Sequence, residues 1–376
     1  MSLSRAASIA DLRLLAKKRL PGFAFDFIDG GAEDEVNLAK NENAFDDIEI
    51  VPRYLVDVST PILQTDLFGT TYGVPFGMAP VGFLNMAWPG SDLMVARLAA
   101  EKQFPHVIST NSSTSIEQIA EAANGFAWFQ LYASKSEALV DELLSRCTAA
   151  QIDILLLTVD VPQPGKRDRD IRNDLKIPFS FTLPILADLA THPQWSLSTL
   201  LAGAPSFGNF EKSGTMSLID VHRRVISDAF NWDDLRRLRD RWPGRLLLKG
   251  ILHPDDAVQA IDAGCDGVVV SNHGGRQADY SPAAITALPG IADAVGGRAP
   301  VLLDSGIRRG GDIIRAKALG ADFTFAGRAF AYGLGAGATA GCHRAYDILE
   351  LELTRALGQI GSPSFHDISS EVLAKY

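Results

Sequence analysis

A histidine and an arginine lie three residues apart in the stretch SNHGGRQ, directly after an apolar run. His273 is a suitable base near neutral pH, and the planar guanidinium of Arg276 matches the two oxygens of a carboxylate. Asp160 closes another apolar run and would stabilise the protonated imidazole. A lone histidine is often structural, but the flanking glycines and the carboxylate favour a catalytic role. These residues predict a site that binds an acid and accepts a proton.

Glycine and arginine also occur close together in LLDSGIRRG (Leu302–Gly310) and AGRAF (Ala326–Phe330), after the last two short apolar runs of the chain. Glycines and arginines after the last two strands of a barrel commonly hold a phosphate. Surface ion pairs of Arg308, Arg309 and Arg328 are the alternative, and the repeated pairing favours phosphate. Arg167 lies in the charged run QPGKRDRDIRND, shortly after Asp160. It either reaches over the same site or belongs to a solvated face, and the sequence leaves both open.

Eight short apolar runs, each followed by a polar or glycine break and a helical pattern, must position these residues. Such runs are typical of buried parallel strands. Their alternation with helices predicts an α/β fold, a (β/α)8 TIM barrel. A helical preface precedes the barrel, and a long insertion follows the fourth strand, between Asp160 and Arg245. The runs are Phe76–Ala79, Val107–Ile108, Ala127–Phe129, Ile154–Val159, Leu246–Leu248, Val268–Val270, Val301–Leu303 and Phe323–Ala326.

The carboxyl ends of the strands carry the functional groups in this architecture. Nearly every predicted strand ends in a hydrogen-bonding or ionisable side chain, which a purely structural barrel does not require. We therefore expect one site at the barrel mouth, where a phosphorylated cofactor could bridge the phosphate holder and the His/Arg/Asp cluster. The ends are Pro80-Val81-Gly82, Ser109-Thr110, Gln130-Leu131-Tyr132, Thr158-Val159-Asp160, Lys249-Gly250, Ser271-Asn272-His273, Asp304-Ser305-Gly306 and Gly327-Arg328.

The composition disfavours several classes of protein. The formal net charge of -10 argues against nucleic acid as a partner. The three cysteines are scattered, so we expect a reducing compartment and neither a disulfide framework nor a metal site. No secretory signal and no membrane-spanning stretch is predicted. The glycine-rich stretch GLGAGATAG lacks dinucleotide-binding spacing and follows the last strand, so we expect it to pack within the final helix.

Together these motifs resemble the FMN-dependent L-2-hydroxy acid dehydrogenases and oxidases, a family that includes glycolate oxidase, L-lactate dehydrogenase and mandelate dehydrogenase. SNHGGRQ is highly specific to that family, and WFQLY, LTVD, GKRDRDIRN, LLKGIL and LDSGIRRG add support. The resemblance runs from Leu20 to the C-terminal helix. It implies a single domain over residues 1–376, with the barrel at about 76–345, that uses FMN to oxidise an L-2-hydroxy acid.

The resemblance also implies a role for each site residue. His273 would take a proton from the substrate, with Asp160 supporting the imidazolium. Arg276 and Arg167 would bind the substrate carboxylate, and Tyr132 would hydrogen-bond the substrate hydroxyl or the developing product. The cofactor-binding residues would be Lys249 near flavin N1; Ala79, Pro80, Val81, Ser109, Gln130, Thr158 and Ser271 around the isoalloxazine; Asp304, followed by Ser305, at the ribityl chain; and Gly306, Arg308, Gly327 and Arg328 at the phosphate.

Two positions, Phe27 and Asn111, depart from the family pattern, and a third, Gly82, bears on the electron acceptor. Phe27 takes the place of a substrate-binding tyrosine, which predicts a substrate with a larger apolar or aromatic side chain. Asn111 replaces a tryptophan of plant glycolate oxidase, which makes a glycolate-tuned pocket doubtful. Gly82 replaces an alanine of several oxidases. It favours a dehydrogenase that passes electrons to quinone or another carrier, with an oxidase that reduces O2 to H2O2 as the alternative.

The apolar insertion, residues 181–210, contains one carboxylate and no lysine or arginine. It predicts an active-site lid, a subunit contact, or a peripheral contact between an otherwise cytoplasmic protein and the inner face of the cell membrane. The family resemblance implies a homotetramer or a larger assembly. Two other functions stay open: a Schiff-base aldolase with Lys249 as nucleophile, and a flavin-binding barrel with lost or altered turnover.

Overall fold

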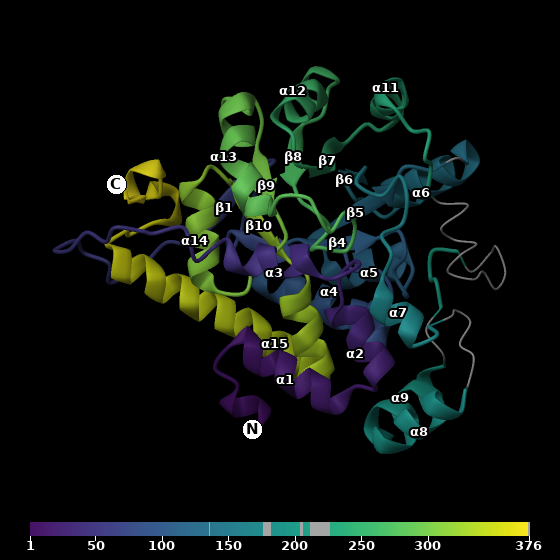
Figure 1. Cartoon of the computed structure of the whole chain (residues 1–376). Coiled ribbons are helices and arrows are strands. Elements are labelled where there is room, and N and C mark those ends of the chain that lie inside the picture. Colours follow the sequence, from purple (N-terminus) through teal and green to yellow (C-terminus); the bar gives the residue numbers. More distant parts are fainter. Residues whose placement is uncertain (135, 176–181, 204–205, 211–225, 375–376) are drawn as a thin grey trace.

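A closed barrel of eight parallel strands forms the centre of the molecule (Figure 1). The computed structural model describes residues 1–134, 136–175, 182–203, 206–210 and 226–374. Each predicted apolar run forms a strand, and β10 pairs with β3 to close the ring. In chain order the strands are β3 (Phe76–Met78), β4 (His106–Ser109), β5 (Ala127–Tyr132), β6 (Ile154–Thr158), β7 (Arg245–Ile251), β8 (Gly267–Val270), β9 (Val301–Leu303) and β10 (Phe323–Ala326).

Helices cover the outside of the barrel, so its strands are buried on both faces. All five residues of β6 are buried, which explains why the runs are continuously apolar rather than alternating. The helices around the barrel are α4 (Ser91–Lys102), α5 (Ile116–Ala123), α6 (Glu137–Ala149), α11 (Trp232–Arg241), α12 (Pro254–Asp262), α13 (Ala284–Val295), α14 (Gly310–Ala318) and α15 (Arg328–Ile360).

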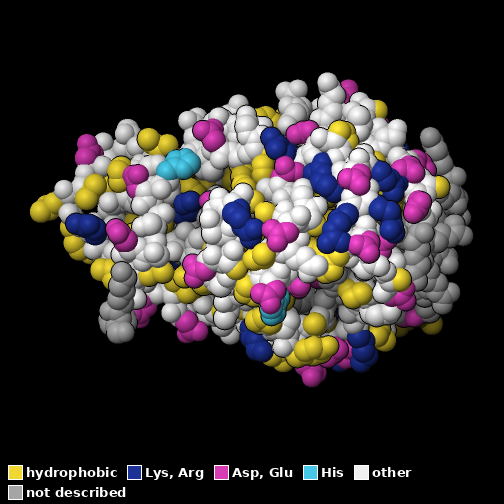
Figure 2. Space-filling view, turned by 90° about the horizontal axis from the view of Figure 1, so that it is seen from above, with side chains coloured by type: hydrophobic (Ala, Val, Ile, Leu, Met, Phe, Trp, Pro, Cys, Tyr) yellow, Lys and Arg dark blue, Asp and Glu magenta, His cyan; other side chains and the backbone are white. Residues whose placement is uncertain are grey.

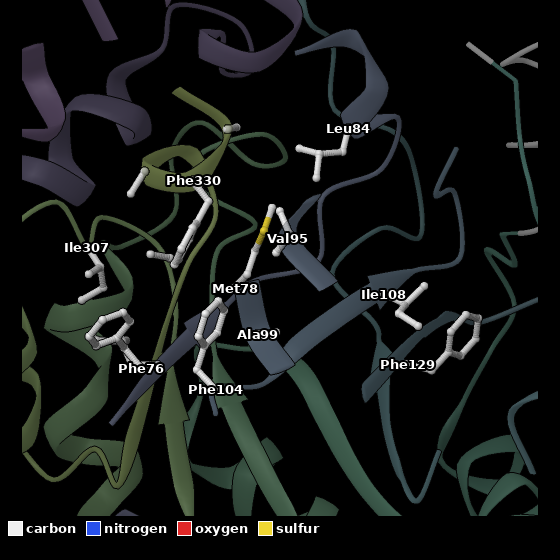
Figure 3. Packing of buried hydrophobic residues seen from close by; sticks show 14 of the residues in the cluster. Phe76, Met78, Leu84, Val95, Ala99, Phe104, Ile108, Phe129, Ile307 and Phe330 are labelled. Atoms are coloured by element: carbon white, nitrogen blue, oxygen red, sulfur yellow. The ribbon is translucent and has the colours of Figure 1, made fainter. Parts of the chain in front are cut away.

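The layer between strands and helices is closely packed with apolar side chains (Figure 3). The ring of Phe104 stacks on that of Phe330 in α15, with their centroids 5.5 Å apart. A second apolar cluster fills the barrel interior below the mouth, where Tyr72 and Leu67 pack with strand residues such as Trp128. These two residues come from an antiparallel hairpin of β1 (Thr65–Leu67) and β2 (Thr70–Tyr72). The interior is therefore a packed core, and the opposite end is free to hold the site.

The predicted preface covers the residues before β3, and its helices are α1 (Ile9–Arg19), α2 (Gly22–Asp29) and α3 (Val36–Asn43). The side chains and backbones of Ser8 and Asp11 form a capping box that fixes the start of α1. Arg344 in α15 donates hydrogen bonds to the carbonyl oxygen of Ala6, and α1 packs along α15. The preface therefore rests on the last helix of the barrel. As predicted, the glycine-rich stretch lies within α15, which kinks at Gly337 and Ala338.

The insertion after β6 begins with α7 (Asp168–Arg172) and continues with α8 (Leu183–Thr191) and α9 (Pro193–Ala202). Of the predicted apolar stretch, Phe181 and residues 204–205 lie outside the described residues. Trp195 attaches α9 to the body: its indole N–H donates to the Met86 carbonyl oxygen at 3.1 Å, and its ring contacts Phe23 edge-on. The Asp188 carboxylate accepts a 2.7 Å hydrogen bond from the Gly22 N–H. The two helices therefore pack on the preface.

Short 3-10 helices complete the described chain. They are η1 (Leu3–Arg5), η2 (Leu84–Met86), η4 (Phe365–Asp367) and η5 (Ser370–Val372). On the face seen in Figure 2, Lys and Arg side chains are interspersed with Asp and Glu. In α11, for example, Arg236 pairs with Asp233 at 2.7 Å. No helix among the described residues is both long enough and apolar enough to cross a membrane.

Candidate active site

A single cavity at the barrel mouth collects most of the predicted site residues. Its wall includes predicted residues from seven strand ends, the loop after β6 and the loop after β8. Those residues are Ala79, Pro80, Val81, Gln130, Tyr132, Thr158, Arg167, Lys249, His273, Arg276, Asp304, Ser305, Gly306, Arg308, Gly327 and Arg328. Three other predicted residues do not line the cavity but form hydrogen bonds with residues that do. These pairs are Ser109 with Gln130, Ser271 with Lys249, and Asp160 with His273.

His273 and Asp160 form a hydrogen-bonded pair at this mouth. The imidazole Nδ1 lies 2.9 Å from Asp160 Oδ1, and the ring is nearly parallel to that of Tyr132, at 6.4 Å between centroids. Burial would raise the pKa of Asp160, but the charges of His273 and Lys249 outweigh it and the pKa is lowered. Asp160 is therefore anionic near neutral pH and can stabilise an imidazolium.

The backbone around His273 is unusual because three consecutive residues have left-handed conformations. His273 has a φ of 59°, Gly274 of 66° and Gly275 of 72°. A Cβ atom at Gly275 would lie 2.6 Å from the backbone nitrogen of Leu38 in α3, so a side chain has no room there. Non-glycine residues rarely adopt this conformation, and such strain is concentrated at functional sites. The glycines after the histidine therefore allow α3 to pack directly against the loop that carries His273.

Asn272 fixes that loop to the helical preface. Its amide group donates to Asn37 Oδ1 at 2.8 Å and to Asn41 Oδ1 at 2.7 Å, while Asn41 returns a hydrogen bond to Asn272 Oδ1. All three side chains are buried, so the hydrogen bonds are not exchanged with water. The preface is thus part of the site. Sequence reasoning missed Asn37 and Asn41, although two amides one helical turn apart share a helix face.

Arg276 and Arg167 bring two positive charges to one side of the cavity. Their guanidinium carbons lie 5.4 Å and 5.6 Å from the centre of the Phe27 ring. Arg276 also donates to the carbonyl oxygens of Phe27 and Gly30, both at 2.9 Å. Burial, with the nearby charges of Arg167 and Arg328, lowers the pKa of Arg276 to about 9. A bound anion would relieve this repulsion, so the arginines suit a carboxylate.

An aromatic wall continues from Phe27 along the cavity. Phe27 meets Phe83 at 6.4 Å between ring centroids, and Phe83 meets Phe207 at 4.7 Å. All three rings line the cavity. Phe27 was predicted to be at the substrate, whereas the parts played by Phe83 and Phe207 were not. The wall gives the cavity an apolar surface beside the arginines.

Lys249 is a buried cation held between two partners. Its Nζ lies 3.1 Å from Asp304 Oδ2 and 2.9 Å from Ser271 Oγ. Burial would lower its pKa, but the carboxylates of Asp304 and Asp160 outweigh it and the pKa is raised. A Schiff-base nucleophile must instead lose its proton readily. The environment of Lys249 therefore argues against the aldolase alternative.

The remaining walls of the cavity fit a flavin nucleotide. Among the described residues, the side-chain nitrogen of Gln130 and the hydroxyl of Thr158 are buried without a hydrogen-bond partner. A ring with polar edges would satisfy both groups, and the neighbouring wall at Ala79 is apolar. Arg328 and Arg308 line the cavity near the glycines of the predicted phosphate holder. Arg308 also forms an ion pair with Glu42 at 2.9 Å. Arg309 does not line the cavity; it pairs with Glu352 and is half exposed, so the alternative of a surface ion pair fits Arg309.

A second network, which the sequence did not indicate, holds the loop carrying Arg167. Asp29 at the end of α2 is 2% exposed and accepts hydrogen bonds from Arg13, Arg169 and Tyr332. Arg169 lies two residues after Arg167, in α7. Burial would raise the pKa of Asp29, but these partners hold it at about 2. The carboxylate thus fastens α7 to the preface, beside the cavity.

The model of the FMN-dependent dehydrogenase family matches residues 16–375. The chain belongs to that family. Among FMN-dependent dehydrogenases, (S)-mandelate dehydrogenase of Pseudomonas putida is 40% identical over 370 residues, covering 97% of this chain and 93% of that protein. L-lactate dehydrogenase of Xanthomonas campestris pv. campestris strain 8004 is 39% identical over 375 residues, covering 98% and 97%. The crystal structure of monotopic membrane protein (S)-mandelate dehydrogenase has a TM-score of 0.95 at 38% identity, covering 99% of this chain and 100% of that chain.

Membership of the FMN-dependent dehydrogenase family confirms three predictions made from the sequence. The chain is an FMN-dependent 2-hydroxy acid oxidoreductase, its cofactor is FMN, and its fold is the TIM barrel. The similar proteins act on different 2-hydroxy acids, because one is named for mandelate and another for lactate. The substrate of this chain must therefore be argued from its own cavity.

Proposed function

We propose that the protein oxidises an L-2-hydroxy acid with an aromatic or large apolar side chain to the 2-oxo acid, with His273 as the base. The observation that carries this proposal is the cavity itself, in which the His273–Asp160 pair, two arginines and an aromatic wall converge. Oxidation of the alcohol requires a proton acceptor and an electron acceptor. The arginines select an acid, and the rings beside them select an apolar side chain.

In this proposal Arg276 and Arg167 bind the carboxylate and so orient the substrate carbon that carries the hydroxyl group. His273 takes up a proton, and Asp160 stabilises the resulting imidazolium. Burial, followed by the charge of Asp160, raises the pKa of Tyr132 to about 12. Its hydroxyl therefore keeps its proton at neutral pH and can donate a hydrogen bond to the oxygen being oxidised.

FMN would supply the two-electron acceptor. Ala79, Pro80, Val81, Gln130 and Thr158 would surround its ring, supported by Ser109 and Ser271 from behind. Lys249 would offset the negative charge that the cofactor gains on reduction. Asp304 with Ser305 would hold the ribityl chain. The phosphate would be held by Gly306, Arg308, Gly327 and Arg328.

Quinone, or another carrier, is the final electron acceptor that we propose. Gly82 lines the cavity beside Asn111, and a Cβ atom there would lie 3.1 Å from the Cβ of Asn111. An alanine at Gly82, as in several oxidases, would thus narrow this part of the wall. The exposed apolar helices α8 and α9 would place the protein at a membrane surface, where quinones dissolve. A related protein is described as a monotopic membrane protein, which supports the same arrangement.

The experiment is anaerobic reduction of the bound flavin by a panel of L-2-hydroxy acids with small, branched and aromatic side chains. We expect rapid bleaching of the flavin absorbance, formation of the 2-oxo acid, and faster reduction by aromatic acids such as (S)-mandelate than by lactate. Reoxidation of the reduced protein then compares a soluble quinone with O2. Absence of bleaching by the whole panel would reject the proposed reaction and favour a barrel with lost turnover. Faster reoxidation by O2 would support the oxidase alternative.

A further inference from the structure

The end of the apolar insertion reaches the cavity through three consecutive residues, Phe207, Gly208 and Asn209. Phe207 is buried, lines the cavity, and lies closest to the Phe83 ring. The aromatic wall therefore begins beside the arginines at Phe27 and continues through Phe83 to Phe207. Phe207 lies far along the chain from Phe27 and Phe83. The insertion thus contributes directly to the surface available for a substrate side chain.

Asn209 fixes this segment with an unusually complete set of hydrogen bonds. Its Oδ1 accepts from the Ile116 N–H at 3.0 Å. Its Nδ2 lies within hydrogen-bond distance of Ser109 O, Thr110 O and Ser112 Oγ, at 3.3, 3.1 and 3.2 Å. The side chain is buried, so water cannot replace these bonds. Asn209 therefore attaches the segment to the loop that follows β4.

Gly208 and Arg146 strengthen the same attachment. The Gly208 N–H donates to Ser112 O at 3.0 Å, and a Cβ atom at Gly208 would lie 2.5 Å from the carbonyl carbon of Thr114. Only glycine lets the backbones approach so closely. Arg146, which is paired with Glu117, donates to the carbonyl oxygen of Asn209 at 2.9 Å. Gly208, Asn209 and Arg146 of α6 thus hold Phe207 in one place.

We propose that Phe207 determines which substrate side chain the enzyme prefers, and that Asn209 is the residue that positions Phe207. This inference rests on the proposed function. The arginines and His273 contact groups that all 2-hydroxy acids share, so they cannot separate one acid from another. Discrimination must come from the apolar wall, and Phe207 is its end farthest from the arginines along the series of rings. A long aryl side chain reaches Phe207, whereas the methyl group of lactate ends nearer Phe27.

The test compares Phe207→Ala and Asn209→Ala with the parent holoenzyme, using (S)-mandelate and L-lactate. We expect Phe207→Ala to lower kcat/KM for mandelate about tenfold or more and to leave lactate within about threefold, because one lost apolar contact has this size. Asn209→Ala should also lower the ratio of kcat/KM for mandelate to kcat/KM for lactate. The double variant should lose no more than Phe207→Ala, since both act through one ring. Phe365→Leu, a change of a buried phenylalanine in η4 that does not line the cavity, is the matched control and should keep the ratio of kcat/KM for mandelate to that for lactate.

A binding measurement keeps the inference testable when a variant is unstable or turnover is absent. The affinities of phenylacetate and acetate, which carry no hydroxyl group to oxidise, are measured from the perturbed flavin spectrum. The parent should favour phenylacetate, and Phe207→Leu, which keeps most of the buried volume, should reduce that preference at least threefold. Equal changes for both acids, or none, would overturn the role of Phe207. A flavin that no hydroxy acid reduces would instead reject the proposed function while leaving this comparison intact.

Discussion

Arg276, Arg167 and Phe27 together decide how a substrate carboxylate would be held. Both guanidinium groups lie over the same aromatic ring, which attracts cations but offers no hydrogen-bond donor. A tyrosine at Phe27, as in the family pattern, would add a hydroxyl donor. In the proposed mode of binding, charge would hold the acid group and apolar contact would hold the remainder of the substrate.

Phe27→Tyr should improve the oxidation of lactate, because a new hydroxyl would donate to the carboxylate. A hydrogen bond to a charged group contributes about 1.5–3 kcal/mol, which corresponds to about tenfold or more in kcat/KM. Steady-state kinetics with lactate measure this directly. Phe25→Tyr adds the same hydroxyl on the same helix, outside the residues that line the cavity, and is the control. Unchanged lactate kinetics in Phe27→Tyr would show that this ring is not at the carboxylate.

The residues that sequence reasoning located are those whose motifs are local. His273 and Arg276 lie in one short stretch, and the strand-end position of Asp160 was enough to predict that it approaches them. Asn41 was missed because it lies in α3, 231 positions before its partner Asn272 in the chain. Phe207 was missed for a similar reason, because it lies at the end of the apolar insertion, far along the chain from the other residues of the aromatic wall.

At the scale of elements, Asp29 joins α1, α2, α7 and α15 through its three partners. The folded protein holds its pKa at about 2, below the ordinary 3.8. A carboxylate whose pKa is lowered by folding stabilises the fold at pH values above its ordinary pKa. It loses that contribution as the pH falls from about 4 towards 2. The contribution is about 1–2 kcal/mol, since Arg13 is partly exposed and its charge is screened.

Asp29→Asn should therefore lower the urea midpoint at pH 7, and its deficit relative to the parent should shrink as the pH approaches 2. Asp26→Asn is the control, because Asp26 pairs with the same Arg169 but is 30% exposed, so a smaller loss is expected. The measurement is urea unfolding followed by circular dichroism between pH 7 and pH 3. A deficit that stays constant with pH would show that the charge of Asp29 is not the cause.

The pair of helices α8 and α9 presents exposed leucines although it is anchored by Trp195. Leu183, Leu200 and Leu201 are about 80% exposed. Replacing all three with glutamine should weaken binding to phospholipid vesicles at least tenfold, because each leucine loses part of the roughly 2 kcal/mol of its burial. Flotation with vesicles measures the binding. The control replaces Leu14 and Leu351, exposed leucines on other helices, and should leave vesicle binding unchanged. Equal losses of vesicle binding in the two variants would argue against a membrane face at α8 and α9.

The elements themselves were largely predictable. The barrel strands are short, and all residues of β6 and β8 are apolar or small and buried, apart from the buried Thr158, so the runs of apolar residues identified them directly. The arrangement of the insertion was not predictable, because apolar composition alone fits a lid, a subunit contact or a membrane face equally well. In the structure the insertion both presents leucines outwards and supplies Phe207 to the cavity.

On the scale of the whole molecule, three parts of the chain build one site. The barrel supplies the strand ends, and the preface supplies Phe27 and the asparagines that hold the loop carrying His273. The insertion supplies Arg167 and Phe207 (Figure 1). The preface and the insertion therefore both form parts of the cavity wall.

The most direct test of this account is anaerobic flavin reduction by (S)-mandelate in the parent and in His273→Gln. Glutamine keeps a polar side chain but cannot accept the proton at neutral pH. The variant should retain FMN and its fold, while flavin reduction slows by about 10²–10⁴-fold, the range typical of a positioned base. His253→Gln, a change of an exposed histidine, is the control and should keep the parental rate. Reduction of the His273→Gln flavin within threefold of the parental rate would contradict the account.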